Sequence, residues 1–181
     1  MTQTANLHGV EYMPMSLAKL IVMRAEVYPR KRVLLPKAGS DVLAHAARTW
    51  GGMVTCTEDD HDAARRLRNA FLAVDTVRFL DLTPDPAFDV VLFGVNMVNA
   101  PEAPHLMIHG ARFLAPGGKL IAVIGRGQLE WRAIVSQRLR GMVERHGSVE
   151  DLPPDTLQYV KNAPPIRLIE IVRPLAKKEP S

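Results

Sequence analysis

The sequence predicts an α/β domain built on a mostly parallel sheet with helices on both faces. Short apolar runs alternate along the chain with stretches of amphipathic, helix-like periodicity, which is the pattern of βαβ units. The chain has 181 residues, of which 47% are hydrophobic, so it is long enough for one domain with its own core. No linker divides it. We expect a flexible N-terminal arm over 1–12, a single domain over 13–174 and a polar tail over 175–181.

The elements follow from spacing and from turn residues. Pro14 opens a stretch with apolar residues three to four apart, which predicts a helix that ends before Pro29. Asp41 is expected to cap a helix over 41–50, and Gly51 and Gly52 end that helix. Further helices are expected over 61–74, 105–114 and 129–147, and strands over 32–36, 53–57, 76–82, 88–95, 119–125 and 167–174.

Composition excludes several classes of protein. The 23 basic and 19 acidic residues give a net charge of +4, a mild preference for an anionic partner. The only cysteine, Cys56, excludes an internal disulfide and is expected to be a buried apolar side chain. His105 and His109 have the spacing of zinc ligands but no third ligand, so no metal site is expected. The sequence has no long apolar span and no apolar signal core, so we expect a cytoplasmic protein without membrane contact.

Two acids mark the expected ligand site. Ligands of open parallel sheets bind beyond the carboxyl ends of the strands. Glu58 follows the second predicted strand, where a carboxylate can accept both hydrogens of a ribose diol; alternatively it is a solvated acid near a helix N-terminus. Asp81 closes the third predicted strand and can accept from an adenine amino group, or it is a turn residue. Their positions at adjacent strand ends are more informative together than separately.

These segments resemble the class I S-adenosylmethionine-dependent methyltransferases. RVLLPKAGSD resembles the first motif of the adenine-type enzymes, VTCTEDD the second, VRFLDL the third and FDVVLFGVN the fourth. HLMIHGARFLAPGGKLIAVIG resembles the helix, turn and strand that follow, and DLPPDTLQYVKNAPPIRLIEIV the final antiparallel hairpin of small phage- and plasmid-borne members. The resemblance covers roughly residues 12–173 and includes the opening helix after Met13-Pro14. It implies a Rossmann-like methyltransferase fold.

The resemblance also implies S-adenosylmethionine as cofactor and assigns residues to it. The positions carried over are Pro36, Ala38, Gly39, Glu58, Asp81, Leu82 and Gly94. Leu35, Lys37 and Asp41 depart from the first motif, which has an acid, a small residue and a glycine at these positions. A lysine and an aspartate there could block the methionine end of the cofactor.

The fourth motif also departs from the family. Adenine methyltransferases have Asp or Asn, two prolines and an aromatic residue there, which hold a flipped base. Gly94 occupies the polar position in this chain, no aromatic residue follows, and Asn96 is the weak candidate for a catalytic residue, two positions later. Transfer to an adenine amino group is therefore not expected.

A late basic segment suggests a partner. Arg126, Arg138 and Arg140 form either a solvated helix face or a face that contacts the phosphates of a nucleic acid. Trp131, in the same segment, is expected in the core, the alternative being a base-stacking role. The sequence gives no indication of the oligomeric state.

Two functions remain open from the sequence. The first is a class I methyltransferase whose acceptor is not an adenine amino group. The second is an inactive pseudo-enzyme that binds a protein or nucleic-acid partner. A dinucleotide-binding protein is not expected, because the turn after the first strand lacks the Gly-x-Gly-x-x-Gly pattern.

Overall fold

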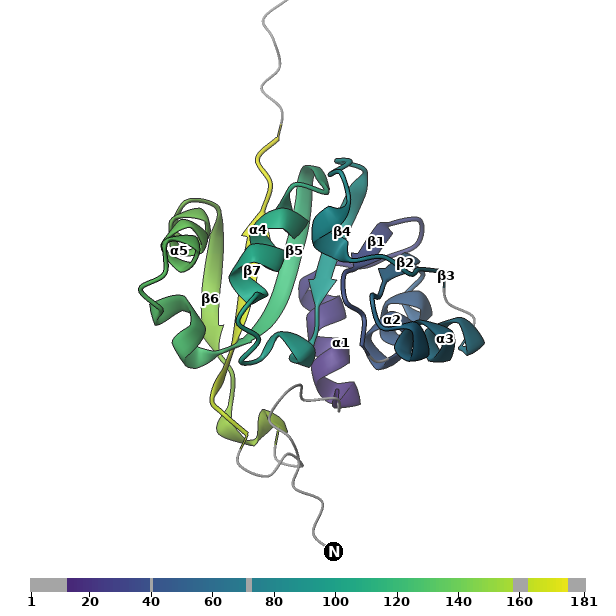
Figure 1. The fold of residues 1–181 in the computed structure, drawn as a ribbon, viewed down its shortest axis with the longest axis horizontal. Coiled ribbons are helices and arrows are strands. Elements are labelled where there is room, and N and C mark those ends of the chain that lie inside the picture. The colour runs from purple at the N-terminus through teal and green to yellow at the C-terminus, as the bar shows by residue number, and fades with distance from the viewer. Residues whose placement is uncertain (1–12, 40, 71–72, 158–162, 176–181) are drawn as a thin grey trace, which may run out of the picture.

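A computed structural model describes residues 13–39, 41–70, 73–157 and 163–175 (Figure 1). In it a seven-stranded sheet is flanked by helices. The elements are α1 (Met15–Arg24), β1 (Arg32–Leu35), α2 (Asp41–Thr49), β2 (Met53–Thr57), α3 (His61–Asn69), β3 (Ala73–Asp75), β4 (Phe88–Phe93), α4 (Ala103–Ala111), β5 (Leu114–Gly125), α5 (Ile134–His146), β6 (Gly147–Asp151) and β7 (Ile166–Val172). Short 3₁₀ helices lie at Phe79–Asp81, Val95–Met97, Arg126–Glu130 and Pro154–Leu157.

The strand order is β3-β2-β1-β4-β5-β7-β6. The first five strands in this order are parallel, while β7 runs antiparallel to both β5 and β6. The chain leaves β1 toward β2 on one side and later returns to β4 on the other, so the order reverses between β1 and β4. The mostly parallel sheet and the antiparallel C-terminal hairpin are confirmed.

Alternate residues of the central strands form two cores, one on each face of the sheet. Val33, Val90 and Leu92 pack with α1, α2 and α3, whereas Leu34 and Val91 face α4 and α5. This alternation explains why the strands are apolar throughout: both faces of a parallel sheet are covered. Figure 1 shows α4 and α5 on the near face and α1 behind the sheet. Among the described residues, no helix has the length and apolar character to cross a membrane.

The third strand is not where the sequence predicted it. The expected strand over 76–82 is wrong: β3 is Ala73–Asp75, whose first two residues lie in the helix expected over 61–74, and Phe79–Asp81 is a 3₁₀ turn. The physical reason is Phe79, which is only 1% exposed and packs its ring 5.1 Å from that of Phe113 on the α4 face. A buried aromatic in a turn imitates the apolar pattern of a strand.

The C-terminal third differs in three details. The expected helix over 129–147 is broken, because Arg126–Glu130 is a 3₁₀ helix and α5 begins only at Ile134. Trp131 lies in the connection and is 37% exposed, so its expected place in the core is wrong. The strand β6 was not predicted, since all five of its residues are exposed and show no apolar alternation.

Near the N-terminus, Asp41 was expected to cap the second helix. It is instead the first residue of α2.

Candidate functional site

A crevice of about 920 Å³ opens at the carboxyl ends of β1, β2 and β4. This is the point where the strand order reverses, the usual ligand site of an open α/β sheet. Three segments line most of it: the loop after β1, the end of β2 with the first turns of α3, and the stretch 94–102 after β4. Its volume is within the range of small-molecule sites, which is roughly 300–1,000 Å³.

Glu58 holds the turn that begins the crevice. It follows β2 directly, is 4% exposed and lines the crevice. Its Oε2 accepts from the backbone N–H of Gly39 at 2.9 Å, and its Oε1 accepts from the N–H of Asp60 at 3.2 Å. A carboxylate oxygen has two lone pairs, so each oxygen keeps one for a ligand hydroxyl.

The loop after β1 takes an unusual path for a lysine. Lys37 has φ +47°, in the left-handed region that side chains other than glycine rarely adopt, and Gly39 has φ +61°. The end of β2 fixes this path, because the carbonyl of Thr57 accepts from the N–H of Ala38 at 3.1 Å. A small residue at position 37 would adopt this turn with less strain.

The side chain of Lys37 reaches across the crevice. Its Nζ lies 3.0 Å from Oε1 of Glu102, the residue just before α4, and both residues line the crevice. A hydrogen bond from its own backbone N–H and the nearby Lys37 ammonium lower the pKa of Glu102, so this acid stays charged. The pair is about one third exposed and joins two walls 65 residues apart in sequence.

Asn96 also connects the two walls. It lies in the 3₁₀ turn after β4, and its Nδ2 donates to the carbonyl of Lys37. A Cβ atom on Gly39 would lie 3.6 Å from this Nδ2, and one on Gly94 would lie 3.5 Å from Oδ1. The amide is thus enclosed between the two glycines that the sequence assigned to the cofactor. Its donor serves the loop after β1.

Gln128 supports the third wall from behind and was missed by the sequence analysis. It is 2% exposed, and its Nε2 donates to the carbonyls of Met97 (3.1 Å) and Ala100 (2.9 Å). Its Oε1 accepts from the backbone N–H groups of Gly125 and, at 3.2 Å, Asn99. One buried side chain therefore ties the segment 94–102 to the end of β5.

Acids outnumber bases around the crevice. The charged residues that line it are Asp41, Glu58, Asp59, Asp60, Asp62 and Glu102 against Lys37 and Arg66. With Lys37 already engaged by Glu102, the field inside favours a ligand that carries positive charge.

The crevice does not include every residue assigned from the sequence. Ala38, Gly39, Glu58, Gly94 and Asn96 line it, together with Lys37 and Asp41. Pro36 and Leu35 are buried below it. Asp81 lies in the 3₁₀ turn with its side chain 69% exposed and 3.8 Å from Arg78, and Leu82 packs on the α4 face. The expected position of Asp81 at the end of the third strand is thus wrong, while its role toward a cofactor stays a prediction.

The late basic residues lie outside the crevice and differ among themselves. Arg126 pairs with Asp151 at 3.1 Å, and Arg140 donates to the backbone carbonyls of Leu129 and Trp131. Arg138 is exposed on α5. Two of the three arginines therefore have structural partners.

The remaining candidates are placed away from the crevice. Cys56 is fully buried in β2, and burial together with the charge of Glu58 raises its pKa to about 12. His109 packs 5.0 Å from the ring of Phe79, and burial lowers its pKa. In the described part of the chain, no group of three or more His, Cys, Asp or Glu is arranged to hold a metal ion.

Comparison with solved structures identifies the fold. The chain aligns with the cyclase SpnF over 90% of its own length and 81% of that chain, with a TM-score of 0.66 and 15% identity. It aligns with the tRNA (m1A58) methyltransferase TrmI from Aquifex aeolicus over 92% and 72%, with a TM-score of 0.66 and 14% identity. The magnesium protoporphyrin IX methyltransferase from Synechocystis PCC 6803, solved with bound SAM, aligns over 87% and 76%, with a TM-score of 0.61 and 16% identity.

The fold is that of the class I methyltransferases. Neither a protein-family model nor a curated protein matches the sequence. The methyltransferase fold hosts more than one chemistry even among these neighbours, since one is named a cyclase.

Proposed function

We propose that the crevice binds S-adenosylmethionine and that the chain is a methyltransferase-like protein whose acceptor is not an adenine amino group. The observation that carries the proposal is Glu58, a buried acid at the end of β2 with free lone pairs beside the Gly39 turn. Such an acid suits the ribose diol of the cofactor. When bound, S-adenosylmethionine supplies an activated methyl group next to a sulfonium cation, and the acidic lining favours that charge.

The residues present fit the adenosine half of this cofactor. Glu58 would hold the ribose, and Gly39 and Gly94 leave room for a close approach of the ligand to the backbone. The methionine half of the cofactor would meet Lys37. The ammonium of Lys37 could bind the methionine carboxylate only after breaking its bond to Glu102. Asp41, at the first turn of α2, repels a carboxylate there.

The absence of an adenine-holding motif supports a different acceptor. The stretch after Phe93 is Gly94-Val95-Asn96-Met97, without an aromatic side chain to stack on a flipped base. The donor of Asn96 is engaged with the loop after β1. The chain's contribution to methyl transfer would then be to position the two reactants and to exclude water.

Calorimetric titration of S-adenosylmethionine and S-adenosylhomocysteine tests the proposal. We expect micromolar binding in the wild type, loss of binding in Glu58→Ala, and no change in Glu144→Ala, which removes an exposed acid on α5. Thermal unfolding of each variant separates loss of the site from loss of the fold. Absence of heat at millimolar ligand, with folded protein, would refute the proposal.

One observation favours a second candidate, a non-catalytic binding module. The Lys37–Glu102 pair bridges the crevice where the methionine half would lie. If this bridge excludes the cofactor, the wild type should show no binding, whereas Lys37→Ser combined with Asp41→Gly should bind. Binding by neither protein would show that the bridge is not the obstacle.

A further inference from the structure

Several large apolar side chains are exposed near the amino ends of β1 and β2. Tyr28 is 53% exposed, Trp50 43% and Met53 61%. Tyr28 lies in the connection from α1 to β1, Trp50 in the connection from α2 to β2, and Met53 is the first residue of β2. Single exposed apolar residues are ordinary, but a group of this size on adjoining loops indicates a contact surface.

The two connections are packed against each other. The N–H of Arg30 donates to the carbonyl of Gly51 at 3.3 Å, and the N–H of Met53 donates to the carbonyl of Lys31 at 2.8 Å. A Cβ atom on Gly51 would lie 2.9 Å from Cγ of Pro29, so the loops touch. Tyr28 and Trp50 flank this contact as direct chain neighbours of Pro29 and Gly51. The two exposed aromatic residues therefore lie on adjoining loops that are hydrogen-bonded to each other.

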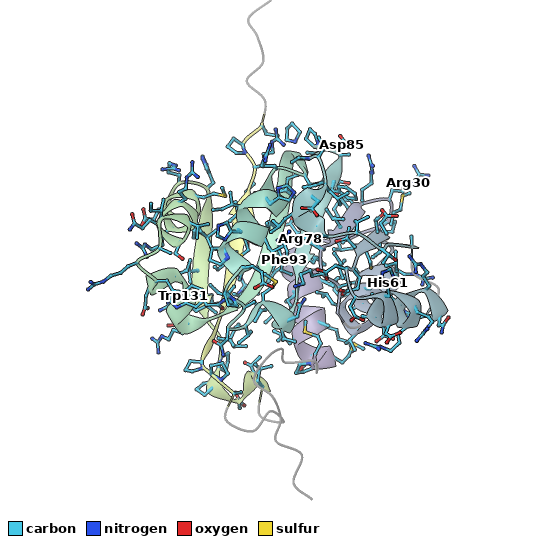
Figure 2. All side chains as sticks on the ribbon, in the orientation of Figure 1. Arg30, His61, Arg78, Asp85, Phe93 and Trp131 are labelled. Atoms are coloured by element: carbon cyan, nitrogen blue, oxygen red, sulfur yellow. The ribbon has the colours of Figure 1, made fainter. Side chains whose placement is uncertain are left out.

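The same surface carries two arginines without acidic partners among the described residues, Arg30 and Arg32, and the guanidinium of Arg32 lies 5.3 Å from the ring centre of Phe88. Arg30 and Arg32 are both exposed, and within the described ranges neither side chain forms an ion pair. Lys31 lies 4.9 Å from the ring centre of Tyr28 and 3.5 Å from Asp89, the acid that faces this surface. Figure 2 shows Arg30 at the outer border of the molecule, away from Trp131 and His61.

The other nearby acid is already neutralised. Glu26, in the loop directly after α1, pairs with Lys119 at 2.8 Å, and this hydrogen bond lowers its pKa. The surface around Tyr28 and Trp50 therefore keeps a positive excess.

The backbone of Arg30 adopts a strained conformation. Its φ is +75°, in the left-handed region that glycine adopts with less strain. Its backbone needs this conformation to place the N–H against Gly51, but the turn does not need an arginine side chain. A cation kept at a position where glycine would be easier is consistent with a role outside the fold.

We propose that this surface, formed by Tyr28, Arg30, Lys31, Arg32, Trp50 and Met53, binds single-stranded nucleic acid. Exposed aromatic rings supply stacking platforms for bases, and the arginines supply contacts to phosphates. A second copy of the chain is a poorer occupant, because a two-fold contact would bring the same cations face to face. Unpaired strands fit better than a duplex, because the bases of a duplex are already stacked on one another.

The surface is separate from the crevice. The strands β1 and β2 begin at this surface and end at the crevice, so the two sites lie at opposite ends of these strands. A strand bound here would tether the protein without occupying the crevice. The inference does not depend on which ligand the crevice holds.

Fluorescence anisotropy of a labelled single-stranded oligonucleotide of about 12 nucleotides tests the proposal. We expect binding that weakens with salt, with a slope of log K against log salt that becomes shallower by about 0.7 when one phosphate contact is removed. Arg30→Gly keeps the turn and should show this change, and Trp50→Ala should weaken binding at least about fivefold. The matched control is Arg138→Ala, which removes an exposed arginine on α5 and should leave affinity unchanged.

Two outcomes would overturn the proposal. The first is no binding at low salt by the folded wild type. The second is a loss of affinity in Arg138→Ala with none in Arg30→Gly, which would place the strand on α5. Light scattering on the same samples shows whether the protein is a dimer. If the wild type is a dimer that does not bind the oligonucleotide, and Trp50→Ala is a monomer, a second copy of the chain covers this surface instead.

Discussion

Replacing Gln128 with methionine keeps the volume of a buried side chain but removes its four hydrogen bonds. The N–H of Gly125 belongs to a buried residue and loses its partner. The carbonyls of Met97 and Ala100 keep the backbone N–H groups of Ala100 (3.2 Å) and Ala103 (3.1 Å), and the exposed Asn99 can turn to water. An unsatisfied buried backbone group costs about 1–3 kcal/mol. One such group predicts a loss of about 2 kcal/mol in the free energy of unfolding, a substantial part of the usual 5–15 kcal/mol.

Urea unfolding followed by circular dichroism measures this loss. With a slope of about 2 kcal/mol per molar urea, the midpoint of Gln128→Met should fall by about 1 M with the slope unchanged. Gln137→Met is the control: this glutamine is exposed on α5 and donates one hydrogen bond, to the carbonyl of Arg132 at 3.0 Å. Its free energy of unfolding should stay within about 0.5 kcal/mol of the wild type. Equal midpoints for the two variants would refute the role assigned to Gln128.

Three other changes test the packing, the electrostatics and the backbone. Gly110→Ala on α4 should destabilise the protein by about 1–3 kcal/mol in the same urea assay, because the new Cβ would lie 2.9 Å from the ring of Phe93; an unchanged midpoint would contradict this. Burial lowers the pKa of His109, so the folded state resists its protonation and stability should fall as the pH drops below about 6.5, the unfolded value. The thermal midpoints of His109→Gln should lose less between pH 7.5 and pH 5.5 than those of the exposed control His105→Gln, and parallel losses would argue against the assignment. Arg30→Gly should raise the free energy of unfolding by up to about 1 kcal/mol, since it relieves a left-handed backbone; destabilisation would show that the arginine side chain supports the fold.

The strands of the sheet centre were predictable because burial on both faces leaves a continuous apolar signature. β4 is apolar over most of its length, and turns elsewhere in the chain are marked by glycines with positive φ, such as Gly39 and Gly51. β3 has three residues and β6 is exposed throughout, so neither gives a periodic signal. Their existence follows from pairing with β2 and β7, which only the folded chain shows.

The position of the crevice was predictable from the sequence, but the side-chain contacts across it were not. Gly39 and Glu58 could be identified because they follow strands at the edge where ligands bind. The bond from Lys37 to Glu102 spans 65 residues, and that from Asn96 to Lys37 spans 59. No local pattern reports such contacts. Gln128 follows the strand predicted over 119–125, but nothing near it in the sequence reveals that four backbone groups converge on it.

Both borders of the sheet resist the addition of another strand. On one side β3 offers only three residues for pairing. On the other, β6 ends in Glu150 and Asp151, which are held by Arg24 and by Arg167, so an incoming strand would have to break ion pairs before it could form backbone hydrogen bonds. Growth of the sheet from chain to chain, the usual route to fibrous aggregates, is thereby discouraged. Copies or partners of this protein should accordingly meet it through its helices and loops.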